Sequence, residues 1–395
     1  MGIRLRRLDL YHVVVPLRTK IAHASHERRA SDNLVVRATL DDGTIGYGEG
    51  VPREYVTGET VQTCLKSLSG FDAAAALGSP SDWVGVVQAL ESLELPENLE
   101  DSRGMAANAA RCALELAILD ACGRRFGVGV GEAVRVCRWG RNWVRPEPGA
   151  VRYSGAITAS EPGRERVSAW KMRLYGFRDV KVKVAVPGQD DVERLAVFRR
   201  IMGRRRDIRL DANEGWRAEE LSERVGPLRQ FGPSVLEQPV PHREVGRLAE
   251  WRGRLGVAVM LDESMCGWPD GQRAVREGLC DLFNVRLSKC GGLIPTLRLL
   301  DLAWREGLGA QLGCHPGETG LLSAAGRHLA ANVRGLRYVE GSYDRHVLAE
   351  NLIREDVTFG YGGWSRPLPG PGLGVTVDEG RLERLSQRRE EVDYG

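Results

Sequence analysis

Three carboxylic acids follow short apolar runs at nearly even spacing along the chain. They are Asp211 in Leu-Asp-Ala-Asn, Glu237 in Leu-Glu-Gln-Pro and Asp262 in Leu-Asp-Glu-Ser, separated by 26 and 25 residues. Each separation is about one strand–helix unit, so parallel strands would bring the three acids together. Adjacent carboxylates repel one another unless a cation lies between them, and oxygen ligands favour Mg²⁺, with Mn²⁺ as a possible substitute. Each acid alone could instead cap a helix or lie at the surface, so the hypothesis depends on the regular spacing.

Lysine is rare in this chain, which makes its few positions informative. Six of the 56 basic residues are lysine and fifty are arginine. Arginine keeps its proton in proteins, whereas a desolvated lysine can act as a base. Lys181 and Lys183 alternate with valine and would share one strand face, where each disfavours the charge of the other. A solvated strand face is the alternative for this pair, and Lys289 would face the acids from the opposite side of a closed barrel.

The elements that would position these residues repeat from residue 151 onward. Short apolar runs alternate with helical segments, and the runs lie near 152–157, 179–185, 207–212, 234–238, 257–262, 282–287, 308–313 and 337–341. Strands that alternate with helices predict a parallel sheet, and eight units predict a TIM-type α/β barrel with catalytic groups at the carboxyl ends of its strands. An open doubly wound sheet is the second possibility, although no G-x-G-x-x-G follows the first run.

The chain has a different pattern on either side of this repeat. Residues 9–50 predict strands with an Asp41-Asp42-Gly43 hairpin turn, and 59–95 and 105–126 predict helices. Together they predict a small N-terminal α+β domain. The Trp- and Pro-containing residues 138–150 predict a linker, and residues 360–395 are Gly- and Pro-rich and then briefly helical.

Composition excludes several classes of protein. The 395 residues carry 56 basic and 53 acidic side chains for a net charge of +3, mixed along the chain, so we expect no nucleic-acid partner. No apolar run is long enough to cross a membrane, and the N-terminus lacks the apolar core of a signal peptide, which predicts a cytoplasmic protein. The eight cysteines are scattered without a C-x-x-C pair, which predicts reduced thiols and no zinc knuckle.

The chemistry-bearing residues resemble the enolase superfamily, and within it the muconate-lactonizing-enzyme subgroup. The resemblance covers nearly the whole chain. It is carried by the Lys-Val-Lys at 181–183, the three spaced acids, Ser-Lys-Cys-Gly-Gly at 288–292, Gly-Tyr-Gly-Glu at 46–49 and the Ala-rich segment 109–120. It implies a modified (β/α)7β-like barrel at 141–345, an α+β capping domain with lid loops at 1–140, and a segment at 346–395 that returns to the cap. It also implies a homo-oligomer.

The resemblance further implies roles for individual residues. Asp211, Glu237 and Asp262 would bind Mg²⁺, which would hold the carboxylate of a small-molecule substrate and stabilise the enediolate formed when the α-proton leaves. A lysine or histidine base paired with Mg²⁺ is the general pattern of this superfamily. Lys183 and Lys289 would act on opposite faces of the substrate and Lys181 would tune Lys183. Asn213 and Glu263 would orient these groups.

The sequence departs from the family pattern where substrates are selected. Arg286 stands where relatives often have lysine, and Tyr338-Val339-Glu340-Gly341-Ser342 lacks the D-x-D pair with which dipeptide epimerases hold a substrate amine. This departure weakens the dipeptide hypothesis. The candidate substrate contacts also lie in these regions; the alternatives are an ordinary polar loop for the first two and a structural role for the histidine after the seventh run. They are His23, Arg28, Tyr55, His315 and Glu318.

Three functional hypotheses follow. The leading one is metal-dependent abstraction of a proton α to a carboxylate, which gives cycloisomerisation, racemisation or epimerisation. The second is syn β-elimination of water, as in o-succinylbenzoate synthases, and loss of mass in the product would identify it. The third is a non-catalytic barrel that serves as a scaffold, which predicts that at least one catalytic group is replaced. The expected acids and lysines are all present, which favours an enzyme.

Overall fold

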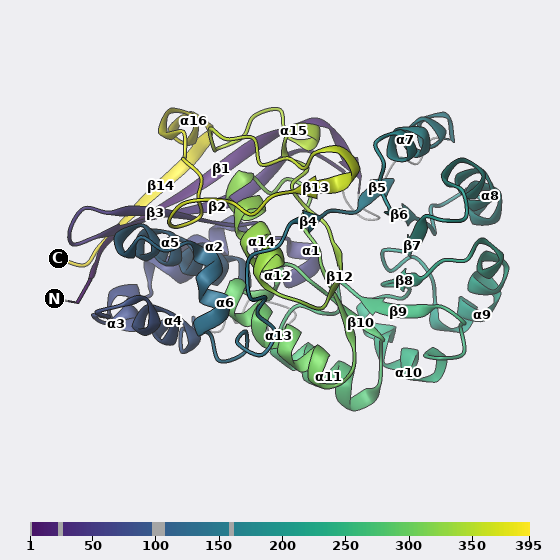
Figure 1. Cartoon of the computed structure of the whole chain (residues 1–395), viewed down its shortest axis with the longest axis horizontal. Helices are drawn as coiled ribbons and strands as arrows, with labels where there is room; N and C mark the ends of the chain where they lie inside the picture. The colour runs from purple at the N-terminus through teal and green to yellow at the C-terminus, as the bar shows by residue number, and fades with distance from the viewer. Residues whose placement is uncertain (1, 23–26, 97–106, 158–161) are drawn as a thin grey trace.

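The computed structural model describes residues 2–22, 27–96, 107–157 and 162–395, and its N-terminal part is an antiparallel sheet (Figure 1). The strand order is β14-β1-β2-β3. The strands are β1 (Leu5–Ala22), β2 (Glu27–Leu40), β3 (Ile45–Gly50) and β14 (Ser386–Asp393). The predicted hairpin is confirmed, because Leu34 pairs with Gly50 and Thr39 pairs with Ile45 across the turn.

Helices follow the first three strands; those within residues 59–95 and 105–126 confirm the predicted helical regions, and three short ones lie outside them. They are α1 (Glu54–Thr57), α2 (Val61–Ser69), α3 (Ala73–Leu77), α4 (Trp83–Glu91) and α5 (Asn108–Phe126), followed by η1 (Val130–Glu132) and α6 (Ala133–Val136). Helix α5 lies directly on β3 because glycine occupies every second position of that strand. A Cβ atom on Gly48 would come within 2.0 Å of the Ala113 carbonyl oxygen, and one on Gly50 within 2.1 Å of the Ala109 oxygen. The alternating glycines therefore fix the height of α5 over the sheet.

The second part is an eight-stranded parallel sheet whose order follows the chain from β5 to β12. Its strands are β5 (Gly155–Ile157), β6 (Asp179–Lys183), β7 (Asp207–Asp211), β8 (Val235–Glu237), β9 (Ala258–Leu261), β10 (Leu282–Val285), β11 (Gly309–Leu312) and β12 (Leu336–Val339). Each strand coincides with one of the eight predicted apolar runs. The eight-unit repeat is therefore confirmed.

Helical segments connect each strand to the next. They are α7 (Pro162–Leu174), α8 (Asp191–Met202), η2 (Ala218–Glu220), α9 (Leu221–Val225), η3 (Gly226–Phe231), η4 (His242–Arg247), α10 (Leu248–Trp251), α11 (Trp268–Glu277), α12 (Leu287–Cys290), α13 (Leu293–Arg305) and α14 (Gly320–Asn332). A single turn, α15 (Asp344–Val347), follows β12 in place of an eighth barrel helix. The sheet curls so far that the Ser154 amide, next to β5, donates to the Val339 carbonyl of β12 at 2.8 Å. The architecture is thus (β/α)7β-like, and the open doubly wound alternative is wrong.

The C-terminal segment runs back to the N-terminal sheet. The short helix η5 (Tyr361–Gly363) leads directly into β13 (Trp364–Ser365), which pairs with β4 (Val151–Arg152), and α16 (Glu379–Leu385) follows. The last strand, β14, pairs with β1 from Arg7↔Asp393 onward, so the two termini lie next to each other at one end of the molecule (Figure 1). Strand β14 was not predicted, because its largely exposed Ser-Gln-Arg-Arg-Glu-Glu sequence has no apolar alternation.

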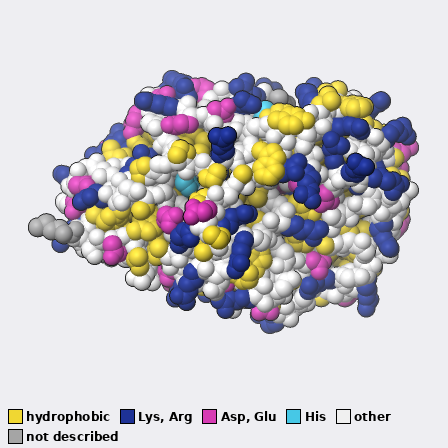
Figure 2. All heavy atoms as spheres, in the orientation of Figure 1, with side chains coloured by type: hydrophobic (Ala, Val, Ile, Leu, Met, Phe, Trp, Pro, Cys, Tyr) yellow, Lys and Arg dark blue, Asp and Glu magenta, His cyan; other side chains and the backbone are white. Residues whose placement is uncertain are grey.

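The surface agrees with the mixed charge of the sequence. On the face in Figure 2, basic side chains are spread over the whole outline with acidic ones among them. Among the described residues, no helix is both long and apolar enough to cross a membrane.

Candidate active site

The acids and lysines singled out in the sequence meet at the carboxyl ends of the barrel strands. Lys183, Asp211 and Glu237 are register neighbours at the ends of β6, β7 and β8. Asp262 directly follows β9, and Lys289 lies in α12 just after β10. The strand register therefore brings together five side chains that are far apart in the sequence.

Lys181 lies among the acids and is held as a cation. Its Nζ is 3.0 Å from Glu340 Oε2, 3.3 Å from Asp211 Oδ2 and 3.5 Å from Glu237 Oε1. Burial acts to lower the pKa of Lys181, but the charges of Glu237, Glu340 and Asp211 outweigh burial and raise it. Lys181 therefore stays protonated and cannot serve as a base in this arrangement.

Lys183 has the opposite environment although it is only two residues away. The residue is half-buried, and its side-chain amine has no hydrogen-bond or ion-pair partner among the described residues, although its backbone carbonyl accepts a hydrogen bond from Arg194 at 2.9 Å. Burial lowers its pKa, and the charge of Lys181 lowers it further, against the opposing charges of Asp211 and Glu263. A lysine with a lowered pKa and an unengaged amine is suited to accept a proton.

Lys289 stands on the other side of the acids and is fully buried. Its Nζ donates to the Asp262 carbonyl at 2.6 Å, to Asp262 Oδ1 at 2.8 Å and to the Asn284 carbonyl at 2.8 Å. Burial lowers its pKa to about 8, and the charge of Arg286 acts in the same direction. The other oxygen of Asp262 accepts a hydrogen bond from Arg286, so this acid is shared between two basic side chains.

The three acids lie among basic side chains. Within the described ranges, no cluster of three or more His, Cys, Asp or Glu side chains stands in a ligand arrangement. Cationic side chains lie where a metal ion would bind. Lys181 contacts both Asp211 and Glu237, and Asp262 contacts Arg286 and Lys289.

The donor chemistry nevertheless fits a hard divalent cation. Glu237 is fully buried, its Oε2 has no hydrogen-bond partner among the described residues, and burial raises its pKa to about 6. A buried carboxylate oxygen without a donor is costly unless a cation binds it. Three carboxylates at consecutive strand ends are the ligand set that Mg²⁺ prefers.

Several positioning residues hold the acids. Asn213 and Glu263, each expected to orient the site groups, contact each other, with Asn213 Nδ2 3.3 Å from Glu263 Oε1. Asn284 was not predicted; its Nδ2 donates to Glu237 Oε1 at 2.7 Å. Gln238 was also missed, and its Oε1 accepts from the amides of Asp262 and Ser264 at 3.0 and 3.2 Å. The only sequence signal for these two was their place in Asn-Val-Arg and Glu-Gln-Pro, directly beside predicted site residues.

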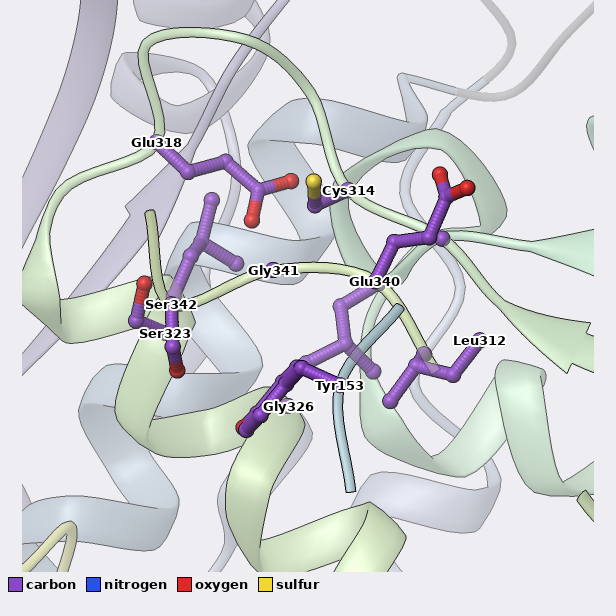
Figure 3. Close-up of a pocket in the computed structure, with 12 residues that line it drawn as sticks. Tyr153, Leu312, Cys314, Glu318, Ser323, Gly326, Glu340, Gly341 and Ser342 are labelled. Atoms are coloured by element: carbon purple, nitrogen blue, oxygen red, sulfur yellow. The ribbon is translucent and has the colours of Figure 1, made fainter. Parts of the chain in front are cut away.

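A small pocket lies at the ends of β11 and β12, and Cys314, Glu318 and Glu340 are among the residues that line it. Figure 3 shows Glu318 extending toward the Cys314 sulfur on one wall, with Glu340 on another. Both oxygens of Glu340 are engaged, by Lys181 and by the buried Arg209 at 3.0 Å each. Burial raises the pKa of Glu318 to about 8.

The predicted substrate contacts are only partly assembled. His23 falls outside the described residues. The guanidinium carbon of Arg28 lies 5.2 Å from the ring centre of Tyr55, which places these two together at the cap. His315 is buried, with Nδ1 3.7 Å from Glu318 Oε1. Of the predicted substrate contacts, Arg28 and Tyr55 therefore lie in the N-terminal part, and His315 and Glu318 lie after β11.

Comparisons with known proteins agree with this architecture. The chain is 24% identical over 388 residues to N-succinyl-L-Arg/Lys racemase of Bacillus cereus, covering 97% of this chain and 98% of the relative. Chloromuconate cycloisomerase of Cupriavidus pinatubonensis is 26% identical, covering 95% and 96%. The crystal structure of dipeptide epimerase from Cytophaga hutchinsonii, complexed with Mg and D-Ala-L-Val, aligns with a TM-score of 0.81 at 22% identity, covering 99% and 100%.

A match to a family model shows the family to which this chain belongs. The model described as "Enolase C-terminal domain-like" matches residues 164–381, more than half of the chain, and spans β6 to β12 with their strand-end acids and lysines. The predicted enolase-superfamily resemblance is therefore confirmed, and this chain belongs to the enolase C-terminal domain-like family.

Proposed function

We propose that this protein is a divalent-metal-dependent isomerase that removes a proton α to a carboxylate and returns a proton to the resulting enediolate. One observation carries the proposal: two lysines with lowered pKa values, Lys183 and Lys289, flank three strand-end carboxylates. The named relatives include racemases, epimerases and a cycloisomerase, which supports the same reaction class for this chain.

Asp211, Glu237 and Asp262 would hold Mg²⁺, or Mn²⁺ in its place. The bound ion would supply Lewis-acid stabilisation as negative charge develops on the substrate carboxylate. Asn284 and Gln238 support this role, because they hold Glu237 and the Asp262 loop in place. Metal ligands generally need such supporting hydrogen bonds.

Lys183 would take the proton from one face of the substrate, since its amine is unengaged and its pKa is lowered. Lys289 would deliver or remove a proton on the other face, with a pKa of about 8 that suits either direction. Lys181 would remain charged and keep Asp211 and Glu237 in place. A base on each face permits racemisation or epimerisation, whereas cycloisomerisation needs a proton on one face only.

Deuterium exchange tests the proposal. The protein with Mg²⁺ in D₂O would be incubated with N-acyl amino acids, dipeptides, cis,cis-muconate and succinylbenzoate precursors, and the products analysed by mass spectrometry. Metal-dependent gain of deuterium without other change in mass is expected. Loss of water would instead assign β-elimination, and absence of exchange on every compound with either metal would refute the proposal. A chelator-treated sample serves as the control.

A further inference from the structure

The acid at the end of β12 is already neutralised inside the protein. Glu340 lies 3.0 Å from Lys181 through one oxygen and 3.0 Å from Arg209 through the other. Burial opposes ionisation, but these two cations lower the pKa of Glu340 to about 2. Ser342, two residues further along, accepts a hydrogen bond from Arg327 at 2.9 Å. This strand end therefore offers no unengaged carboxylate to a substrate ammonium.

Arg28 and Arg53 of the N-terminal part add positive charge near His315. Arg53 is buried, and the groups that accept its hydrogen bonds are neutral: the Ser31 hydroxyl and the carbonyls of Asp32, Pro52 and Pro316. Arg28 is half-buried against Tyr55, and in the described part of the chain it has no carboxylate partner. Other arginines at the N-terminal sheet do have an acid partner, as Arg7, Arg37 and Arg389 pair with Asp9. Two guanidiniums that have no carboxylate partner among the described residues favour the binding of an anion near them.

His315 faces this group of cations from the barrel. It is 3% exposed, and neither ring nitrogen has a hydrogen-bond partner among the described residues. Burial, together with the charges of Arg286, Arg53, Lys289 and Arg28, holds the pKa of His315 well below its ordinary value. Its nearest acid, Glu318, is itself buried with a raised pKa and adds little negative charge at neutral pH. A buried imidazole with two unused nitrogens can donate one hydrogen bond to a bound anion.

We infer that the substrate carries a second anionic group, remote from the reacting carbon, that binds between Arg28 and His315, and that it carries no free ammonium group. The inference rests on the proposed function and narrows it. It favours dianions such as N-succinyl amino acids or muconates over zwitterionic dipeptides. The supporting geometry is the pairing of cap arginines with an unpartnered barrel histidine on one side, and the engaged Glu340 on the other.

Matched compounds that differ by one charge test the inference. N-succinyl derivatives of the common amino acids would be compared with their N-succinamoyl analogues, in which an uncharged amide replaces the distal carboxylate. L-Alanyl dipeptides would supply the free ammonium, and cis,cis-muconate would be paired with its monomethyl ester. Deuterium exchange in D₂O with Mg²⁺ is the readout. We expect exchange on the dianions about tenfold to a hundredfold faster than on the amide or ester partners.

Two matched variants locate the effect. Arg28→Met removes the charge but keeps an apolar side chain of similar length, and Arg29→Met changes the adjacent exposed arginine on the other face of β2. Arg28→Met is expected to abolish the preference for dianions while keeping the melting temperature, and Arg29→Met to leave both unchanged. His315→Gln, which retains a donor, is expected to keep most of the preference, and His315→Leu to lose it.

The outcomes separate the two levels of the argument. Equal exchange on charged and uncharged partners, or faster exchange on dipeptides, would overturn this inference and leave α-proton abstraction standing. Preference for dianions that survives Arg28→Met and His315→Leu would also overturn it, since the anion would bind elsewhere. Absence of metal-dependent exchange on every compound would overturn the proposed function and the inference with it.

Discussion

Two buried glutamates show how differently the chain treats a carboxylate at the cap–barrel junction and at the barrel mouth. At the junction, Glu49 of β3 accepts bonds from Asn33 Nδ2 at 2.6 Å, the Thr319 hydroxyl at 2.7 Å, and the amides of Thr319 and Leu322 at 3.0 and 3.1 Å. At the mouth, Glu237 accepts one bond from Asn284 and lies 3.5 Å from Lys181, while no donor to its Oε2 is found in the described part of the chain. Both side chains are fully buried.

The difference lies in how completely each carboxylate is satisfied. The donors around Glu49 are neutral, come from both parts of the molecule and include the N-terminal amides of α14, so this acid joins the cap to the barrel. Glu237 is surrounded by charges of both signs, and its Oε2 accepts no hydrogen bond from the described residues. Burial alone therefore does not identify a functional acid. A buried carboxylate that has an oxygen without a hydrogen-bond donor and lies next to charged side chains is the better candidate.

The largest expected effect comes from the mouth. Lys183→Arg keeps the charge but removes the ability to release a proton near neutral pH. We expect α-proton exchange to fall about 10²- to 10⁴-fold, because that is the usual contribution of a general base. The melting temperature should stay within about 2 °C, since the amine makes no contact that arginine would break. Lys171→Arg in the exposed part of α7 is the control. Normal exchange by Lys183→Arg would remove this lysine from the mechanism.

A substitution at the junction should lower the stability of the protein far more than its exchange activity. Glu49→Ala leaves the Thr319 and Asn33 donors buried without an acceptor, at about 1–3 kcal/mol for each unsatisfied group. We expect the free energy of unfolding, measured in urea, to fall by about 3 kcal/mol or more, with exchange activity per folded molecule reduced much less. Glu54→Ala, an exposed acid nearby, should change neither. A Glu49→Ala variant that is stable but inactive would show that Glu49 serves the reaction rather than the joining of cap and barrel.

The mouth could be predicted from the sequence far better than the junction. Asp211, Glu237 and Asp262 follow apolar strands at one-unit intervals, and parallel pairing converts that spacing directly into proximity. Glu49 gave no such signal, because its partner Thr319 is 270 residues away and the pairing depends on how the cap docks. Gln238 and Asn284 act through side-chain hydrogen bonds whose partners follow from tertiary structure alone.

A similar limit applies to whole elements. The alternation of valine with lysine at 180–183 predicted β6, whereas β14 forms from charged residues that β1 pairs at the sheet edge. Tertiary pairing outweighs local propensity at such an edge. The residues that select the substrate lie on loops, where periodicity carries no information.

An effect of intermediate size is expected on metal binding at the mouth. Glu237→Gln removes one negative charge from the proposed ligand set but keeps its shape. We expect Mn²⁺ affinity, measured by calorimetry or electron paramagnetic resonance, to fall at least about tenfold. Stability should change little, because Lys181 keeps Asp211 and Glu340 as partners. Glu250→Gln on the surface is the control, and unchanged Mn²⁺ affinity in Glu237→Gln would exclude Glu237 from the ligands.

The smallest expected effect is a pH dependence of stability that belongs to the junction. Burial raises the pKa of Glu49 from 4.5 to about 7 in the folded protein, against the hydrogen bonds from Thr319, Leu322 and Asn33. Since the folded state holds this proton more tightly than the unfolded state, the contribution of Glu49 is fully present below pH 4.5. It is lost as pH rises from about 4.5 to 7.

The measurement is the difference in unfolding free energy between wild type and Glu49→Gln, which carries no titrating group at this position. Other buried acids titrate in both proteins and cancel in the difference. We expect wild type to lose about 1–3 kcal/mol relative to the variant between pH 5 and pH 7. A difference that is flat across this range would mean that Glu49 stays ionised when buried. In that case the four donors, rather than a bound proton, would compensate its burial, and the junction would resemble the mouth more closely than the distances suggest.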